Sequence, residues 1–167
     1  GVDMGAAPMS EIADVKTEGR YLSPANAEVQ DYILQAISEI VVNYDVDGIH
    51  LDYVRYPNTA YDFSETARTQ YRRRYGADPL DVVRKEPQSD DDFKLLEEIT
   101  HFRVKQIDSH IIRIDKRIEL LDSHVLLSAA VKPNPHTAYY TYGQNWAGWL
   151  EEGYLDFVVL MSYSEEN

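Results

Sequence analysis

A histidine and an aspartate two residues apart are the strongest chemical signal in this sequence. His50 and Asp52 lie in an apolar-rich segment, residues 48–54, whose length is typical of a β-strand. Alternate residues of a strand face opposite sides, so the imidazole and the carboxylate are expected on one face. They lie towards the carboxyl end of the segment, where parallel α/β proteins place their active sites. The pair therefore predicts a functional site at the end of a strand.

The segments around this strand alternate between helical and strand patterns. Apolar residues spaced by three and four predict amphipathic helices over 27–43, after Asn26 as N-cap, and over 92–121. The remaining pattern predicts helices at 63–75 and 145–152, strands at 125–131 and 155–163, and irregular connections at 56–64, 79–91 and 136–144. Strands that alternate with crossover helices indicate a parallel α/β sheet.

Composition excludes several classes of function. The 167 residues carry a formal net charge of −13, which argues against a nucleic-acid partner, because phosphate binding needs a basic surface. There is no cysteine, hence no disulfide or thiolate metal site, and no apolar run of about 18 residues that would insert into a membrane. Residues 1–20 are interpreted as a connecting loop and 21–167 as one domain. Since the chain begins with Gly1, it is expected to be a processed protein or a piece of a longer one.

Four segments resemble the glycosyl-hydrolase-like family 10 proteins, which are relatives of the family 18 chitinases. They are YLSPANAEVQDYILQAISEIVVNYDVDGIHLDYVRYP, LLSAAVKPNP, QNWAGWLEEGYLDFVVLMSY and the long helix before the second of these. The match covers most of residues 21–163 in the right order. The resemblance implies a (β/α)8 TIM barrel, a fold that takes about 250 residues. The chain is therefore expected to hold only the middle of one, from the end of the third strand to the sixth.

The chain departs from the chitinase pattern Asp-x-x-Asp-x-Asp-x-Glu. At those four positions it has Asp47, His50, Asp52 and Val54, so the second acid is a histidine and the catalytic glutamate is absent. The chitinase aspartate after Met-x-Tyr on the sixth strand is replaced by Ser164. The resemblance to relatives with His-x-Asp on the fourth strand implies that Asp52 is a catalytic acid.

Hydrolysis of a glycosidic bond needs one carboxylic acid that protonates the leaving oxygen and a second carboxylate that attacks or activates water. Asp52 is the candidate acid, and His50 is expected to tune its pKa. The alternatives are a structural Asp52 paired with Arg55, and a His50 satisfied within the core. Asp47 has the opposite face parity and is expected to be a turn residue. The sequence does not identify the second carboxylate: Glu165 and Glu166 follow the sixth strand and are candidates, and solvated loop residues are an equal explanation for both.

Further side chains near strand ends are expected to bind the carbohydrate substrate. The cationic and polar ones are Arg55, Lys132, Asn134 and His136, and the aromatic ones are Tyr53, Tyr56 and Tyr163. Arg55 and Lys132 would suit an anionic saccharide. Trp146 and Trp149 are interpreted as packing residues.

Two other classes of function stay open. In the first, His50 and Asp52 are half of a metal site in a metal-dependent hydrolase. In the second, the barrel binds carbohydrate without cleaving it. The favoured hypothesis is a glycoside hydrolase without a metal or other cofactor, located outside the cytoplasm or in the cell envelope, as the family implies. We expect the isolated piece to be inactive, and either to self-associate or to need the remainder of the barrel.

Overall fold

Three parallel β-strands form the centre of the protein. The computed structural model describes residues 21–83 and 87–163. Strands β1 (Gly48–Leu51), β2 (Leu126–Val131) and β3 (Phe157–Leu160) pair in that order, and both pairings are parallel. The prediction of an α/β protein with a parallel sheet is confirmed.

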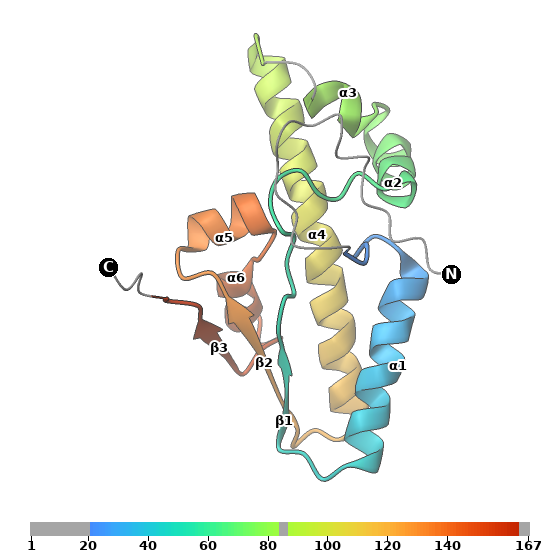
Figure 1. Ribbon diagram of the computed structural model, residues 1–167, viewed down its shortest axis with the longest axis vertical. Helices are drawn as coiled ribbons and strands as arrows, with labels where there is room; N and C mark the ends of the chain where they lie inside the picture. Colours follow the sequence, from blue (N-terminus) through green and yellow to red (C-terminus); the bar gives the residue numbers. More distant parts are fainter. Residues whose placement is uncertain (1–20, 84–86, 164–167) are drawn as a thin grey trace.

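Two long helices pack side by side next to the sheet (Figure 1). Helix α1 (Ala27–Asn43) begins after Asn26, whose side chain accepts a hydrogen bond from the amide of Glu28. Helix α4 (Asp90–Leu121) has 32 residues and begins after a serine cap, Ser89. At a rise of 1.5 Å per residue, α4 is about 48 Å long, so it extends well beyond the strands. Both helices follow their predicted limits to within two residues.

The hydrophobic core lies between these helices and one face of the sheet. Alternate residues of β2 point into it, because successive side chains of a strand face opposite sides. Its buried members include Leu127, Ala129 and Val131 from the sheet and Ile107, Ile111, Ile114 and Ile118 from α4. The apolar stripe of the long helix thus seals one face of the sheet.

The opposite face of the sheet is open. Leu126, Phe157 and Val159 lie on it, and each is close to half exposed, at 46%, 47% and 48%. His50 shares this face, since it pairs in register with Ser128, which itself pairs with Phe157. Apolar side chains gathered in this way on an exposed surface usually mark a contact with another part of a protein.

Four shorter helices connect these elements. They are α2 (Glu65–Tyr75), α3 (Pro79–Val83), α5 (Pro135–Tyr142) and α6 (Trp146–Glu151). In the described part of the chain, no helix is both long and apolar enough to cross a membrane. The loop predicted over residues 1–20 lies outside the described residues.

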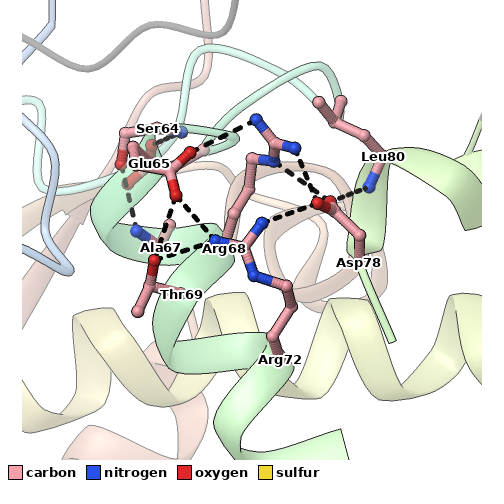
Figure 2. A network of polar contacts seen from close by, with 9 residues as sticks. Ser64, Glu65, Ala67, Arg68, Thr69, Arg72, Asp78 and Leu80 are labelled. Carbon is pink, nitrogen blue, oxygen red and sulfur yellow. Dashed lines mark hydrogen bonds and ion pairs between the residues drawn. The ribbon is translucent and has the colours of Figure 1, made fainter. Parts of the chain in front are cut away.

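The connection between α2 and α3 is held by one carboxylate (Figure 2). Asp78 accepts two hydrogen bonds from Arg68, at 3.0 and 2.6 Å, and one from Arg72 at 2.8 Å. The amide of Leu80 at the start of α3 is a further donor, at 3.0 Å. These hydrogen bonds, with that of Arg68 the largest influence, lower the pKa of Asp78 to about 2. One arginine of the basic last turn of α2, Arg72, therefore neutralises the charge of a nearby carboxylate.

Four predicted elements differ from the observed ones, and one of them is the strand predicted over 155–163, which is observed only over Phe157–Leu160. The expected loop 136–144 is largely helix α5, which starts with an Asn134 cap and Pro135 and ends at Gly143 in the left-handed conformation. The connection 79–91 contains the short helix α3. The strand predicted over 48–54 ends at Leu51, because the backbone of Tyr53 adopts the left-handed conformation.

Candidate functional site

His50 and Asp52 lie exposed at the carboxyl end of β1. The Nδ1 atom of His50 is 2.9 Å from the hydroxyl oxygen of Ser128 on the neighbouring strand, which orients the imidazole. The Asp52 carboxylate accepts a hydrogen bond of 2.7 Å from the amide of Tyr53. Within residues 21–83 and 87–163, Asp52 has no ion-pair partner, so the alternative of a salt bridge between Asp52 and Arg55 finds no support. Both side chains are accessible to a ligand.

The backbone at Tyr53 ends the strand and redirects the chain. Its φ angle is +59°, in the left-handed region that costs a residue with a side chain about 1 kcal/mol. Its hydroxyl donates to that of Tyr21 at 2.9 Å, and the two rings stack with centroids 5.3 Å apart. The guanidinium carbon of Arg55 lies 3.9 Å from the centroid of the Tyr53 ring. The ring predicted to stack on a sugar is thus engaged by protein groups.

A cavity of about 280 Å³ lies beside Asp52, between the end of β1 and helices α1 and α4. Its wall includes Arg55 and the buried His110 of α4. The Nδ1 atom of His110 has no hydrogen-bond partner. Burial, together with the charge of Arg113, lowers the pKa of His110 to about 4, so the imidazole is neutral near pH 7.

Arg55 and Lys132 share one aromatic ring. The guanidinium carbon of Arg55 is 5.5 Å from the ring centroid of Tyr142, and the ammonium nitrogen of Lys132 is 5.0 Å from the same centroid. The Nε atom of Arg55 is buried without a hydrogen-bond partner. The structure thus brings together two of the predicted substrate-binding cations, one following each of two neighbouring strands.

A buried glutamine fixes the relative position of these two strand ends. Gln144 is 1% exposed, and its side-chain oxygen accepts a hydrogen bond from the amide of Lys132 at 3.0 Å. Its amide nitrogen donates to the carbonyls of Ala130, at 3.1 Å, and Val54, at 3.4 Å. Sequence reasoning missed this residue. The available signal was a polar side chain next to Gly143, in the short connection between that helix end and the next helix.

Tyr56 does not provide the stacking surface that the sequence predicts. It is 3% exposed, because the Arg103 guanidinium lies over its ring, 4.5 Å from the centroid, and α4 covers it. Burial raises the pKa of the Tyr56 phenol. Arg103 also donates to the carbonyls of Asn58, at 2.7 Å, and Thr141, at 3.2 Å. This arginine, missed from sequence, ties the loop after β1 to helix α5. Its place four residues after Ile99, within the apolar stripe, was the available signal.

The other predicted site residues are more scattered. Asn134 caps α5 by accepting from the amide of Thr137 at 2.9 Å, and His136 is exposed in the first turn with its ring 4.5 Å from that of Tyr140. Tyr163 follows β3 and is 83% exposed. Glu165 lies outside the described residues.

The two tryptophans pack as predicted. Trp149 is 1% exposed, and its indole donates to Asp108 at 2.7 Å. The indole of Trp146 donates to the carbonyl of Lys132 at 3.0 Å, so it holds the main chain of a predicted site residue in place. Among the described residues, no group of three His, Cys, Asp or Glu side chains has the arrangement of a metal site. His50 and Asp52 therefore have no third ligand of these types there.

Known proteins are similar to this chain in sequence and in fold. The profile of a family described as Glycosyl hydrolase-like 10 matches residues 9–167. An S-layer-related protein of Niallia circulans is 27% identical over 176 residues, an alignment that covers 86% of this chain and 11% of that protein. Glycosyl hydrolase YngK of Bacillus subtilis (strain 168) is 26% identical over 151 residues, covering 86% of this chain and 28% of that protein.

The fold has a counterpart among solved structures. The glycoside hydrolase domain of PgaB (BpsB) from Bordetella bronchiseptica superposes with a TM-score of 0.68 at 17% identity, covering 89% of this chain and 43% of that one. The chain thus spans less than half the length of each of these three proteins.

Proposed function

Because this chain belongs to the glycosyl hydrolase-like 10 family, we propose that it is part of a glycoside hydrolase that cleaves a polysaccharide or a glycoconjugate. The observation that carries the proposal is the exposure of His50 and Asp52 at the carboxyl end of a parallel strand. In α/β folds this end of the sheet is where substrates bind. The names of the relatives, one of them a glycosyl hydrolase, support the same reaction class.

Asp52 acts as the general acid in this proposal. Asp52 is exposed, is among the residues that line the cavity, and has no ion-pair partner within the described residues, so its carboxylate is free to approach a glycosidic oxygen. His50 lies two residues before it on the open face and is oriented by Ser128. We assign His50 the role of a neighbour that adjusts the charge around the acid.

The sheet is proposed to be the middle of a (β/α)8 barrel, with β1, β2 and β3 as its fourth, fifth and sixth strands. The open face, with Leu126, Phe157 and Val159, would then be the barrel interior, which the remaining strands close. Alone, the 167-residue chain would lack that closure and be inactive. By analogy with the S-layer-related protein, we place the whole enzyme in the cell envelope or outside the cell.

A second function is a barrel that binds carbohydrate without cleaving it. It is favoured by the residue at the chitinase glutamate position, Val54, which lines the cavity and has no acid function. The two functions differ in one measurable property, the release of new reducing ends.

The test uses Asp52→Asn in the complete protein that contains this chain. We expect turnover of a cleaved polysaccharide, measured as reducing ends released, to fall by about 10²-fold or more, as is typical when general acid catalysis is lost. Asp47→Asn, at the other end of β1, is the matched control and is expected to keep full turnover. A loss of less than about tenfold in Asp52→Asn would reject Asp52 as the acid. Binding without any hydrolysis by the wild type would establish the second function.

A further inference from the structure

We propose that Arg55, Lys132 and Tyr142 form a subsite for an anionic substituent of the saccharide, most simply the carboxylate of a uronic acid. The inference depends on the proposed function in one respect, namely that the anion is carried by a saccharide. The anion site itself follows from the contacts of the three side chains.

The first argument is charge without a partner. Within the described ranges, neither Arg55 nor Lys132 has a carboxylate within ion-pair distance, although the chain carries 29 acidic residues and a net charge of −13. The other described arginines next to acids, such as Arg68 and Arg72, are paired with them. Two cations at one ring repel each other unless an anion lies nearby. A ligand anion would supply the missing charge.

The second argument is the geometry of Arg55. Its guanidinium lies over the ring of Tyr53 and near that of Tyr142, which leaves the N–H groups in its plane to point elsewhere. The Nε–H is buried and has no acceptor in the protein. That atom is closed to a ligand, but the terminal N–H groups of the half-buried Arg55 side chain offer a pair of donors that a planar carboxylate fits well.

The third argument is that the subsite is rigid before any ligand binds. The main chain of Lys132 is held at its amide by Gln144 and at its carbonyl by Trp146. The amide of Tyr56, next to Arg55, donates to the carbonyl of Tyr142 at 2.9 Å. Three elements thus hold two cations around one ring. Such preorganisation is what a specific polar site requires.

The experiment is affinity electrophoresis of the complete protein in gels that contain polygalacturonate, alginate or hyaluronan as carboxylated probes. Dextran and fully methyl-esterified pectin are the neutral probes. We expect at least one carboxylated polymer to retard the protein, and this retardation should decrease as the salt concentration rises. The neutral polymers should cause no salt-dependent retardation. Because these 167 residues carry a net charge of −13, general ion exchange of this part of the protein with a polyanion is unfavourable, so retention that depends on Lys132 indicates a local cationic site.

The decisive variant is Lys132→Met, which keeps the length of the side chain and removes its charge. We expect the apparent dissociation constant for the retarding polymer to rise about tenfold. Lys94→Met, which removes an exposed charge from α4, should leave it unchanged. Circular dichroism of both variants checks the fold. No retardation by any carboxylated polymer, or equal retardation of the two variants, would overturn the subsite.

Asp52→Asn separates this proposal from the catalytic one. If the subsite is correct, this variant is still retarded by the carboxylated polymer, whatever happens to turnover. If retardation depends on Lys132 but turnover is unchanged by Asp52→Asn, the subsite is retained and the catalytic assignment is rejected. Turnover that depends on Asp52, without Lys132-dependent retardation, would do the reverse.

Discussion

The side-chain oxygen of Gln144 accepts a hydrogen bond from the main-chain amide of Lys132, 3.0 Å away and sealed from solvent. The other end of the same side chain reaches the carbonyls of Ala130, in β2, and of Val54, in the segment that follows β1. One glutamine therefore sets how far the residues after β1 stand from those after β2. In this protein the geometry of the proposed anion subsite depends on a side chain that cannot itself touch the ligand.

Replacing this glutamine should cost stability as well as geometry. Gln144→Leu removes the side-chain partner of one buried carbonyl and of a half-buried amide and carbonyl, so we expect the free energy of unfolding to fall by about 2–4 kcal/mol. Urea unfolding followed by circular dichroism measures the change. Gln35→Leu, on the exposed side of α1, is the control and should fall within about 0.5 kcal/mol of wild type. Equal stability of the two variants would contradict the role of Gln144.

The buried imidazole of His110 predicts an acid-sensitive fold. Its pKa of about 4 lies below the value of 6.5 in an unfolded chain, so the unfolded state binds the proton more readily. The contribution of the neutral imidazole to the free energy of unfolding is fully present above pH 6.5. It is lost as the pH falls from 6.5 towards 4, by up to about 3 kcal/mol.

Chemical unfolding at pH 7 and pH 4.5 checks this expectation. Protonation of carboxylates also lowers stability on acidification, and it does so in every variant. The quantity to compare is therefore the loss in free energy of unfolding between pH 7 and pH 4.5. This loss should be distinctly smaller for His110→Leu than for wild type. The control is His124→Leu, whose histidine side chain is 95% exposed, and it should follow the wild-type profile. Parallel curves for all three proteins would rule out His110 as the sensor.

Asp78 predicts a second acid transition at lower pH. Because its pKa is lowered from 3.8 to about 2, its contribution is complete above pH 3.8 and is lost as the pH falls towards 2. Asp78→Asn should therefore destabilise the protein by about 1–2 kcal/mol at pH 7 and by much less at pH 2.5. Thermal unfolding at the two pH values measures this difference. Asp45→Asn, an exposed aspartate before β1, should change stability at neither pH.

The open face of the sheet predicts association of the isolated chain. Phe157 and Val159 are nearly half exposed on an edge strand, and an exposed apolar edge invites pairing with another chain. We expect light scattering to show oligomers of the 167-residue chain. The double variant Phe157→Thr/Val159→Thr should weaken their association by about tenfold or more.

The control for association is Phe93→Thr/Leu120→Thr, which removes two exposed apolar side chains near the ends of α4. It should leave the oligomers intact. A monomeric preparation of the isolated chain with full hydrolytic activity would contradict both the proposed missing strands and the expected association.

The sequence determined the local elements of this protein. The limits of α1 and α4 follow from apolar spacing and from the caps Asn26 and Ser89, which act within one turn of the chain. The parallel sheet follows from strands that alternate with helices. Helix α5 was missed because its tyrosines have no clear apolar period, although Pro135 and Gly143 marked its ends.

Only the tertiary structure decided which side chains meet. The faces of β1 are predictable from alternation, but the left-handed turn at Tyr53 is not, and it carries Arg55 to the ring of Tyr142. Tyr56 was expected at the surface, yet Arg103, 47 positions later, buries it. Hydrogen bonding and burial depend on distance in space, and spacing along a chain fixes that distance only within a single helix or strand.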